Sequence, residues 1–253
     1  MKRKIIELSP DGCKEKESLV AAEKLFRVNI NGRDLLTLVA SPHEPEVLVT
    51  GFLYLQGMIA APDDIIALGI CSDSGQVAVT VRKELPESLL PIISSGCGGG
   101  IVFAEGSVPA VGATGQSFPA GDAALAIRQG MARLLAVAEQ YSAHGGIHSA
   151  AICDCTGLLL HAEDLGRHNT IDRLAGAALR QRIDVSGKLL LTSGRISSEM
   201  VAKAIRLGVK VLASRTSPTD LAVELCCDHG VGLAGYVRGG SMEVYTHPEQ
   251  FTA

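Results

Sequence analysis

The second half of the chain alternates short apolar runs with segments of helical spacing, and this rhythm limits the fold more than any other feature. Strands that alternate with helices predict a layered α/β sheet, and two runs joined by a tight turn predict an antiparallel pair at its end. The expected strands are 147–153, 157–161, 188–192, 209–213, 231–237 and 242–246. The expected helices are 122–140, 169–180, 198–207 and one that Ser217 caps.

The first half is expected to form a smaller α+β domain. Residues 25–40 alternate around Asn31-Gly32, a dipeptide that is typical of a tight hairpin turn. Pro45 opens a helix-like segment, because proline is favoured at an early helical position, and residues 77–81 alternate as a short strand. Residues 1–18 are polar and are expected to be frayed.

The composition excludes several classes of protein. The net charge is −4, whereas general nucleic-acid binding needs a strongly basic surface, so no nucleic-acid partner is expected. No apolar run approaches the ~18 residues that a membrane span needs, and the N-terminus does not resemble a signal peptide, so no membrane association is expected. Seven irregularly spaced cysteines fit a reducing, cytoplasmic environment better than a disulfide framework.

Four arginines lie in turns of small residues at or just after the end of an apolar run: Arg167, Arg195, Arg215 and Arg238. The planar guanidinium suits phosphate and carboxylate oxygens, and the glycines and serines beside it let backbone N–H groups approach the same anion. Ligands of open α/β sheets bind beyond the carboxyl ends of the strands. If the strands are parallel, the four turns form a common anion-binding rim, although a serine in such a turn is also explained as a helix cap.

A loop rich in glycine, serine and proline runs from about 91 to 121 and contains Cys97 within S-S-G-C-G-G-G. Loops of this length are typically functional or disordered, and we place the domain boundary near its end, giving domains of 1–118 and 119–253. Glycines on both sides of Cys97 allow backbone N–H groups to stabilise an anionic sulfur. A flexible turn that happens to contain a cysteine is the alternative.

The segment 163–172, E-D-L-G-R-H-N-T-I-D, gathers acids, bases and an amide before an expected helix start, and it includes Arg167 and His168. A helix N-terminus beside an arginine is suited to bind an anion. A capped helix with surface ion pairs is the plainer interpretation. His148, near the start of a strand, fits a core position as well as a site. The cysteines lack the spacing of a zinc site, so no permanent metal is expected.

Five blocks of the second half resemble, in the same order, the formate dehydrogenase accessory sulfurtransferase family, the FdhD sulfur carriers. The blocks are G-G-I-H-S-A-A, E-D-L-G-R-H-N-T-I-D-R, T-S-G-R-I-S-S-E-M-V-A-K, S-R-T-S-P-T-D-L-A-V-E-L and G-Y-V-R-G-G-S-M-E-V-Y-T. They cover nearly all of 145–247. The resemblance implies a cytidine-deaminase-like layered α/β C-terminal domain, a cytoplasmic location and a homodimer.

The resemblance also implies an activity, that of a sulfurtransferase. A family member takes sulfur from a cysteine desulfurase as a cysteine persulfide and transfers it to the molybdenum bis(molybdopterin guanine dinucleotide) cofactor, or its tungsten counterpart, for formate dehydrogenase. The family's persulfide cysteine falls in the loop that holds Cys97. The family's cofactor-binding segment corresponds to Tyr236, Val237, Arg238, Gly239, Gly240 and Ser241. We add as candidates for the same pocket Arg167, His168, Arg195 and Arg215.

The chain departs from the family pattern in the cysteine loop. The family commonly shows C-x-x-C there, whereas three glycines follow Cys97, so a single thiol remains in the loop. One thiol is enough to carry a persulfide, but its isolation favours a second hypothesis, a chaperone that delivers the cofactor without moving sulfur. Zinc-dependent deamination needs H-x-E and P-C-x-x-C, and neither motif is present, so this activity is excluded.

Overall fold

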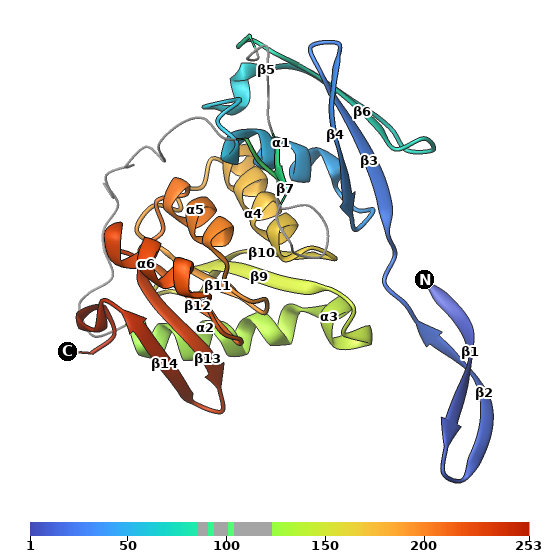
Figure 1. Cartoon of the computed structure of the whole chain (residues 1–253), viewed down its shortest axis with the longest axis vertical. Coiled ribbons are helices and arrows are strands. Elements are labelled where there is room, and N and C mark those ends of the chain that lie inside the picture. Colours follow the sequence, from blue (N-terminus) through green and yellow to red (C-terminus); the bar gives the residue numbers. More distant parts are fainter. Residues whose placement is uncertain (85–90, 94–100, 104–122, 253) are drawn as a thin grey trace.

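The computed structural model describes residues 1–84, 91–93, 101–103 and 123–252 (Figure 1). The predicted domain boundary at 118/119 and the predicted nucleophile Cys97 therefore lie outside the described residues. Two short strands, β7 (Pro91–Ile93) and β8 (Ile101–Phe103), pair antiparallel. In the part of the chain that the structure describes, no helix has the length and apolar character needed to cross a bilayer.

A six-stranded sheet forms most of the C-terminal half, and the predicted layered α/β class is confirmed. Its strand order is β10-β9-β11-β12-β13-β14. The three strands β11, β12 and β13 are parallel, whereas β9, β10 and β14 pair antiparallel with their neighbours. The strands are β9 (His148–Cys153), β10 (Leu158–Asp164), β11 (Leu189–Thr192), β12 (Val211–Ser214), β13 (Gly232–Arg238) and β14 (Ser241–Thr246).

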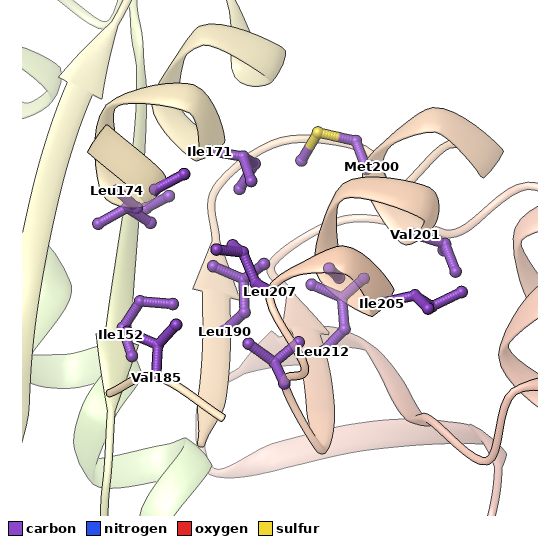
Figure 2. Packing of buried hydrophobic residues seen from close by; sticks show 14 of the residues in the cluster. Ile152, Ile171, Leu174, Val185, Leu190, Met200, Val201, Ile205, Leu207 and Leu212 are labelled. Atoms are coloured by element: carbon purple, nitrogen blue, oxygen red, sulfur yellow. The ribbon is translucent and has the colours of Figure 1, made fainter. Parts of the chain in front are cut away.

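Helices cover both faces of this sheet (Figure 1). One face packs against α4 (Arg167–Gln181), α5 (Ser198–Arg206) and α6 (Asp220–Asp228), and the other against α2 (Ala123–Val137). Because successive strand residues point to opposite faces, Leu190 packs with side chains of α4 and α5 (Figure 2), whereas Leu189 and Leu191 pack with those of α2. Strands buried on both faces read as continuous apolar runs, which is why the sequence indicates them clearly.

The expected helix 122–140 is divided in two. The helix α2 ends at Val137, and a second helix, α3, spans Glu139–His144. The Glu163 carboxylate accepts hydrogen bonds from the N–H groups of Gln140 and Tyr141 at 3.1 and 2.7 Å. In an uninterrupted helix these groups would bond to carbonyl oxygens of α2, so a carboxylate from β10 starts a new helix there.

A four-stranded mixed sheet and one helix form the N-terminal half. The strand order is β4-β3-β6-β5, and of its pairs only β3–β6 is parallel. The hairpin turn at Asn31-Gly32 is confirmed, with φ of 50° and 83°. The sequence does not predict β5, because most of its residues are exposed and no buried face sets a clear alternation. The elements are β3 (Lys24–Ile30), β4 (Arg33–Ala40), α1 (Pro45–Leu55), a 3-10 turn (Pro62–Asp64), β5 (Ile65–Cys71) and β6 (Gln76–Val81).

Two glycines bring α1 and α4 into backbone contact between the two sheets (Figure 1). A Cβ at Gly51 would lie 1.7 Å from the carbonyl oxygen of Asp172, and a Cβ at Gly176 would lie 1.9 Å from that of Val47. Only glycine fits on either side of this crossing. The helix α4 therefore joins the N-terminal core to the sheet that carries the arginine turns.

The expectation that residues 1–18 are frayed is wrong. They form a hairpin of β1 (Lys2–Ser9) and β2 (Gly12–Leu19), which projects away from both larger sheets (Figure 1). Nearly all of its side chains are exposed. A polar composition suggests disorder because it offers no buried face, yet a two-residue turn is enough to pair two such strands.

Candidate functional site

The four arginine turns lie along one edge of the six-stranded sheet. The parallel strands β11, β12 and β13 end at this edge: Arg195 lies three residues after β11, Arg215 directly follows β12, and Arg238 is the last residue of β13. The antiparallel strand β9 begins there with His148, and β10 returns to it, with Arg167 three residues after its last residue. The predicted shared rim is confirmed as an arrangement, and we call these four arginines with their turns the arginine edge.

Hydrogen bonds join the turns that follow β11 and β12. The Arg215 N–H donates to the Thr192 carbonyl oxygen at 3.1 Å. The Ser214 hydroxyl donates to the Gly194 carbonyl oxygen at 2.6 Å. Since Ser214 is buried, it positions the backbone of both turns rather than facing a ligand.

The helix cap that we expected at Ser217 is wrong. Thr219 caps α6, because its Oγ1 accepts the Ala222 N–H at 3.4 Å. The Ser217 carbonyl oxygen accepts the Ile196 N–H at 3.2 Å and so links the two turns once more. Ser217 and Thr219 are both suitable helix caps by residue type, so the sequence does not distinguish them. The hydrogen bond between the two turns at Ser217 leaves Thr219 as the cap of α6.

The end of β13 is tied to the same turns. The Tyr236 N–H donates to the Thr216 carbonyl oxygen at 3.1 Å, and Arg238 Nε donates to the Arg215 carbonyl oxygen at 2.9 Å. Arg238 and Arg195 are exposed, and Arg215 is partly exposed. Three arginines with exposed or partly exposed side chains therefore lie on adjacent, mutually bonded turns.

Tyr236 has a left-handed backbone, with φ of 49°, and its side chain is 41% exposed. Such a conformation costs a residue with a Cβ on the order of 1–3 kcal/mol and is found preferentially at ligand sites. It coincides with the irregular register of β13 and β14 between Gly235 and Arg238. Tyr236 thus presents an exposed aromatic side chain on the strand that ends in Arg238.

The rest of the predicted 236–241 segment has mixed roles. Gly239 and Gly240 both have positive φ and form the two-residue turn to Ser241, which confirms the predicted hairpin. Val237 is buried in the cluster that packs against α2, so it supports the segment without facing a ligand.

Arg167 differs from the other three arginines because it is buried, at 8% exposure. It begins α4 and lies against Gly194, where an added Cβ would be 2.9 Å from Arg167 Cβ and 3.1 Å from His148 Nδ1. Burial, followed by the charge of Arg167, lowers the pKa of His148, so this imidazole is neutral at pH 7. Glycine at position 194 thus leaves room for both side chains against the same stretch of backbone.

Replacing Gly194 by alanine is expected to push Arg167 out of place. The unfolding free energy should fall by about 1–3 kcal/mol, because the new methyl group overpacks a site closed by a side chain stem and an imidazole. The binding of inorganic pyrophosphate, measured by calorimetry, should weaken in parallel. Gly69→Ala is the matched control, since a Cβ there meets no atom within 4 Å. Equal stability and affinity of both variants would contradict this account of Gly194.

His168 is fully buried, so it acts on a ligand only through its neighbours. Its Nε2 lies 2.9 Å from Glu199 Oε2 and 3.3 Å from Ser197 Oγ, both at the start of α5. Burial lowers the pKa of His168, and the hydrogen bond to Glu199 opposes that effect. His168 therefore holds the first turns of α4 and α5 together. The sequence gives no reason to single out Glu199, because an acid in a first helical turn is common.

Other polar residues of the 163–172 segment join the two halves of the chain. Asp164 is fully buried and accepts hydrogen bonds from Arg173 Nε at 2.8 Å, Asn169 Nδ2 at 2.7 Å and the Ser41 N–H at 3.2 Å. Arg173 also donates to the Ser41 and His43 carbonyl oxygens, at 2.8 and 2.7 Å. The density of polar residues in this segment thus serves assembly as much as a site.

The buried Asp172 also has a structural role. Lys203 of α5 donates to both of its carboxylate oxygens, at 2.7 and 2.8 Å. Burial raises the pKa of Asp172, and the ammonium of Lys203 opposes this shift. The pair fixes the packing of α4 against α5 and keeps the arginine edge in register.

The six described cysteines lie away from the arginine edge. Two are buried, Cys153 and Cys226, and burial raises the pKa of each thiol to about 12. Cys155 follows the end of β9 and Cys227 lies near the end of α6, both at the opposite edge of the sheet. The remaining two are Cys13 in the projecting hairpin and Cys71 at the end of β5.

Known proteins resemble the chain over almost its whole length. The pattern of the FdhD/NarQ family matches residues 21–252. A protein named sulfur carrier protein FdhD from Staphylococcus haemolyticus is 36% identical over 230 residues, 89% of this chain and 87% of the relative. A protein of the same name from Staphylococcus aureus strain JH9 is 35% identical over 227 residues, 88% of this chain and 85% of the relative.

A crystal structure from Desulfotalea psychrophila, assigned as a formate dehydrogenase accessory protein, has the same fold. Its TM-score is 0.77 at 24% identity, and the match covers 99% of this chain and 98% of the other. The family pattern, the similar relatives and the ordered sequence blocks all indicate the same family. The chain belongs to the FdhD/NarQ family.

Proposed function

We propose that this protein carries sulfur as a persulfide on Cys97 and transfers it to a molybdenum or tungsten bis-guanine-dinucleotide cofactor for formate dehydrogenase. The observation that carries the proposal is the convergence of Arg195, Arg215 and Arg238 on one sheet edge in a member of this family. Pyrophosphate groups of the dinucleotide suit such a set of planar cationic forks. Relatives named sulfur carrier protein support the sulfur assignment, and a structural neighbour described as a formate dehydrogenase accessory protein supports the client assignment.

The sulfur steps follow ordinary persulfide chemistry. The Cys97 thiolate attacks the terminal sulfur of a desulfurase persulfide, the S–S bond of that persulfide breaks, and the desulfurase cysteine leaves as a thiolate. The terminal sulfur then passes from Cys97 to the metal centre of the bound cofactor, and Cys97 leaves as a thiolate. The reduced metal of this substrate supplies the two electrons that convert the transferred sulfur atom to sulfide.

The positions of four of the other cysteines support Cys97 as the carrier. A carrier needs an accessible thiolate near its acceptor, and a thiol with a raised pKa is mostly protonated at pH 7. Cys153 and Cys226 fail this requirement because they are buried. Cys155 and Cys227 fail it by lying at the edge of the sheet opposite the arginines.

Delivery of the cofactor without sulfur transfer is the second candidate function. The observation that favours it is the single thiol of the cysteine loop, where the family commonly has two. The two functions differ in one measurable property. After incubation with a cysteine desulfurase and L-cysteine, a sulfur carrier gains the mass of one sulfur atom, whereas a delivery chaperone keeps its mass.

Replacing Arg238 by alanine is expected to weaken binding of guanosine diphosphate, a probe for one half of the dinucleotide. The loss should be about ten- to hundredfold, because one charge-assisted hydrogen bond contributes about 1.5–3 kcal/mol. Titration calorimetry at several salt concentrations should also show a shallower salt dependence than in the wild type.

The matched control for this prediction is Arg180→Ala, which removes the same charge from an exposed position in the last turn of α4. Its affinity for guanosine diphosphate should equal that of the wild type. An Arg238→Ala variant that binds as tightly as the control would remove the arginine edge from the nucleotide site. Sulfur loading from a desulfurase would be unaffected by that result, so the two halves of the proposal are tested separately.

A further inference from the structure

The hairpin of β1 and β2 precedes residues 21–252, the part of the chain that the family pattern matches. It forms a two-stranded sheet of its own and extends away from the two larger sheets (Figure 1). Two of its apolar side chains, Ile6 and Leu8, are 63% and 79% exposed. A two-stranded hairpin without a buried face is only marginally stable in water, so a further strand would stabilise it.

The outer edge of β1 has free hydrogen-bonding groups at known positions. Met1 and Val20 exchange both of their backbone hydrogen bonds, at 2.9 and 3.1 Å. Because bonded and non-bonded pairs alternate in an antiparallel ladder, the odd-numbered residues of β1 bond to β2. The N–H and C=O groups that point to the open edge are those of Lys2, Lys4, Ile6 and Leu8. Within the described residues β1 pairs only with β2, so this edge can accept another strand.

We propose that this edge pairs antiparallel with the same edge of a second copy of the chain, about a two-fold axis at Ile5. The result is a continuous sheet of order β2-β1-β1-β2. Its ladder hydrogen bonds join Lys4 to Ile6 of the partner subunit and Lys2 to Leu8 of the partner subunit, which are the groups that point outward. Arg3 then lies opposite Glu7 of the partner subunit, and the symmetry forms this pair twice.

The sequence of β1 selects this register over its neighbours. A two-fold axis normal to a sheet keeps each side chain on its own face, so the axis must pass through a residue that faces its own copy. An axis at Lys4 would oppose two ammonium groups, and an axis at Ile6 would place Ile5 against Glu7. Only the axis at Ile5 pairs opposite charges and sets isoleucine against isoleucine. Such cross-strand pairs are the ones that stabilise a sheet.

The outer edge of β2 does not offer this self-complementarity. Its lysines, Lys14 and Lys16, share one face, and its acids, Glu15 and Glu17, share the other. A two-fold axis at Lys16 would set Lys16 against its own copy and Glu15 against Glu17 of the partner subunit. An axis at Glu15 would set Glu15 against its own copy and Lys14 against Lys16 of the partner subunit. Both arrangements oppose like charges, which destabilises a sheet. Charge therefore distinguishes the two edges of the hairpin and assigns the interface to β1.

The first test is a charge reversal in the full chain, followed by sedimentation equilibrium over a range of concentrations. Arg3→Glu should raise the dissociation constant of the self-association at least about tenfold, because two attractive pairs become two repulsive ones. A triple variant, Arg3→Glu with Glu7→Arg and Lys14→Glu, should recover it. The third change keeps opposite charges at the hairpin's own Glu7–Lys14 pair. Arg180→Glu, with the same change in net charge at a distant exposed position, should associate like the wild type.

The second test is a cysteine cross-link in a Cys13→Ser background. Ile5→Cys places two thiols at a pair whose Cα atoms lie about 4.5 Å apart, within the range that a disulfide spans. Mild oxidation should yield a covalent dimer, whereas Lys16→Cys on β2, three strands from its copy, should remain monomeric on denaturing gels. Self-association that Arg3→Glu leaves unchanged, or an Ile5→Cys variant that does not cross-link, would overturn the proposal.

Discussion

Replacing Cys97 by serine is expected to abolish sulfur loading. Serine is close to cysteine in size, but its hydroxyl cannot attack a persulfide at neutral pH, because it is not ionised there. After incubation with a cysteine desulfurase and L-cysteine, intact-mass spectrometry should show one added sulfur atom on the wild type and none on the variant. Formate dehydrogenase matured with the variant should lack activity.

Cys155→Ser is the control for this experiment, since Cys155 is the exposed cysteine next to β9 at the opposite edge of the sheet. It should load sulfur like the wild type. Loading that persists in Cys97→Ser and disappears in Cys155→Ser would move the carrier role to Cys155. A Cys97→Ser variant that carries no sulfur but still supports formate dehydrogenase would establish cofactor delivery as the function.

Replacing Asp164 by asparagine is expected to cost the fold about 3–5 kcal/mol, because it leaves the Arg173 guanidinium buried without its counter-charge. The side chains of Asp164 and Arg173 are 0% and 3% exposed, so water cannot compensate. The carboxylate also accepts bonds from Ser41 and Asn169, and the amide of asparagine cannot accept all of them. Urea unfolding, followed by circular dichroism, measures the loss.

Asp154→Asn is the matched control, because the Asp154 carboxylate lies 4.0 Å from Lys188 Nζ in a partly exposed pair. A pair of this kind contributes about 0–1 kcal/mol, so this variant should unfold close to the wild type. Equal unfolding midpoints for Asp154→Asn and Asp164→Asn would show that the buried pair does not hold the two halves together.

The sequence predicts the C-terminal sheet well because its strands are buried on both faces and each ends in a recognisable turn. Leu189–Thr192 and Val211–Ser214 are found within two residues of the expected positions. The sequence-based predictions fail where a residue distant in the sequence determines the start or end of an element. The carboxylate of Glu163 starts α3, and no pattern local to 138–144 indicates this. Exposed strands such as β1 and β5 give equally little signal, because no buried face imposes an alternation.

The sequence predicts which turns form the candidate site, but it does not predict the burial and contacts of the side chains in them. Small residues around Arg195, Arg215 and Arg238 indicate an anion-binding edge, and parallel pairing brings them together. Burial separates the remaining candidates in a way that residue type does not reveal. Histidine is a residue type that is common in functional sites, yet His168 is fully buried and contacts Glu199. The left-handed backbone of Tyr236 is likewise a product of the β13–β14 register.

The helix α4 has a consequence for regulation, because it serves two ends at once. Its first turn contains Arg167 at the arginine edge, while Arg173 further along grips the backbone at Ser41 and His43. A ligand that stabilises one position of α4 also stabilises the docking of Ser41 and His43 on Arg173. By thermodynamic reciprocity, this docking raises the ligand affinity of the arginine edge by the same factor. A substitution that undocks Ser41 and His43 from Arg173 is therefore also expected to weaken ligand affinity at the arginine edge.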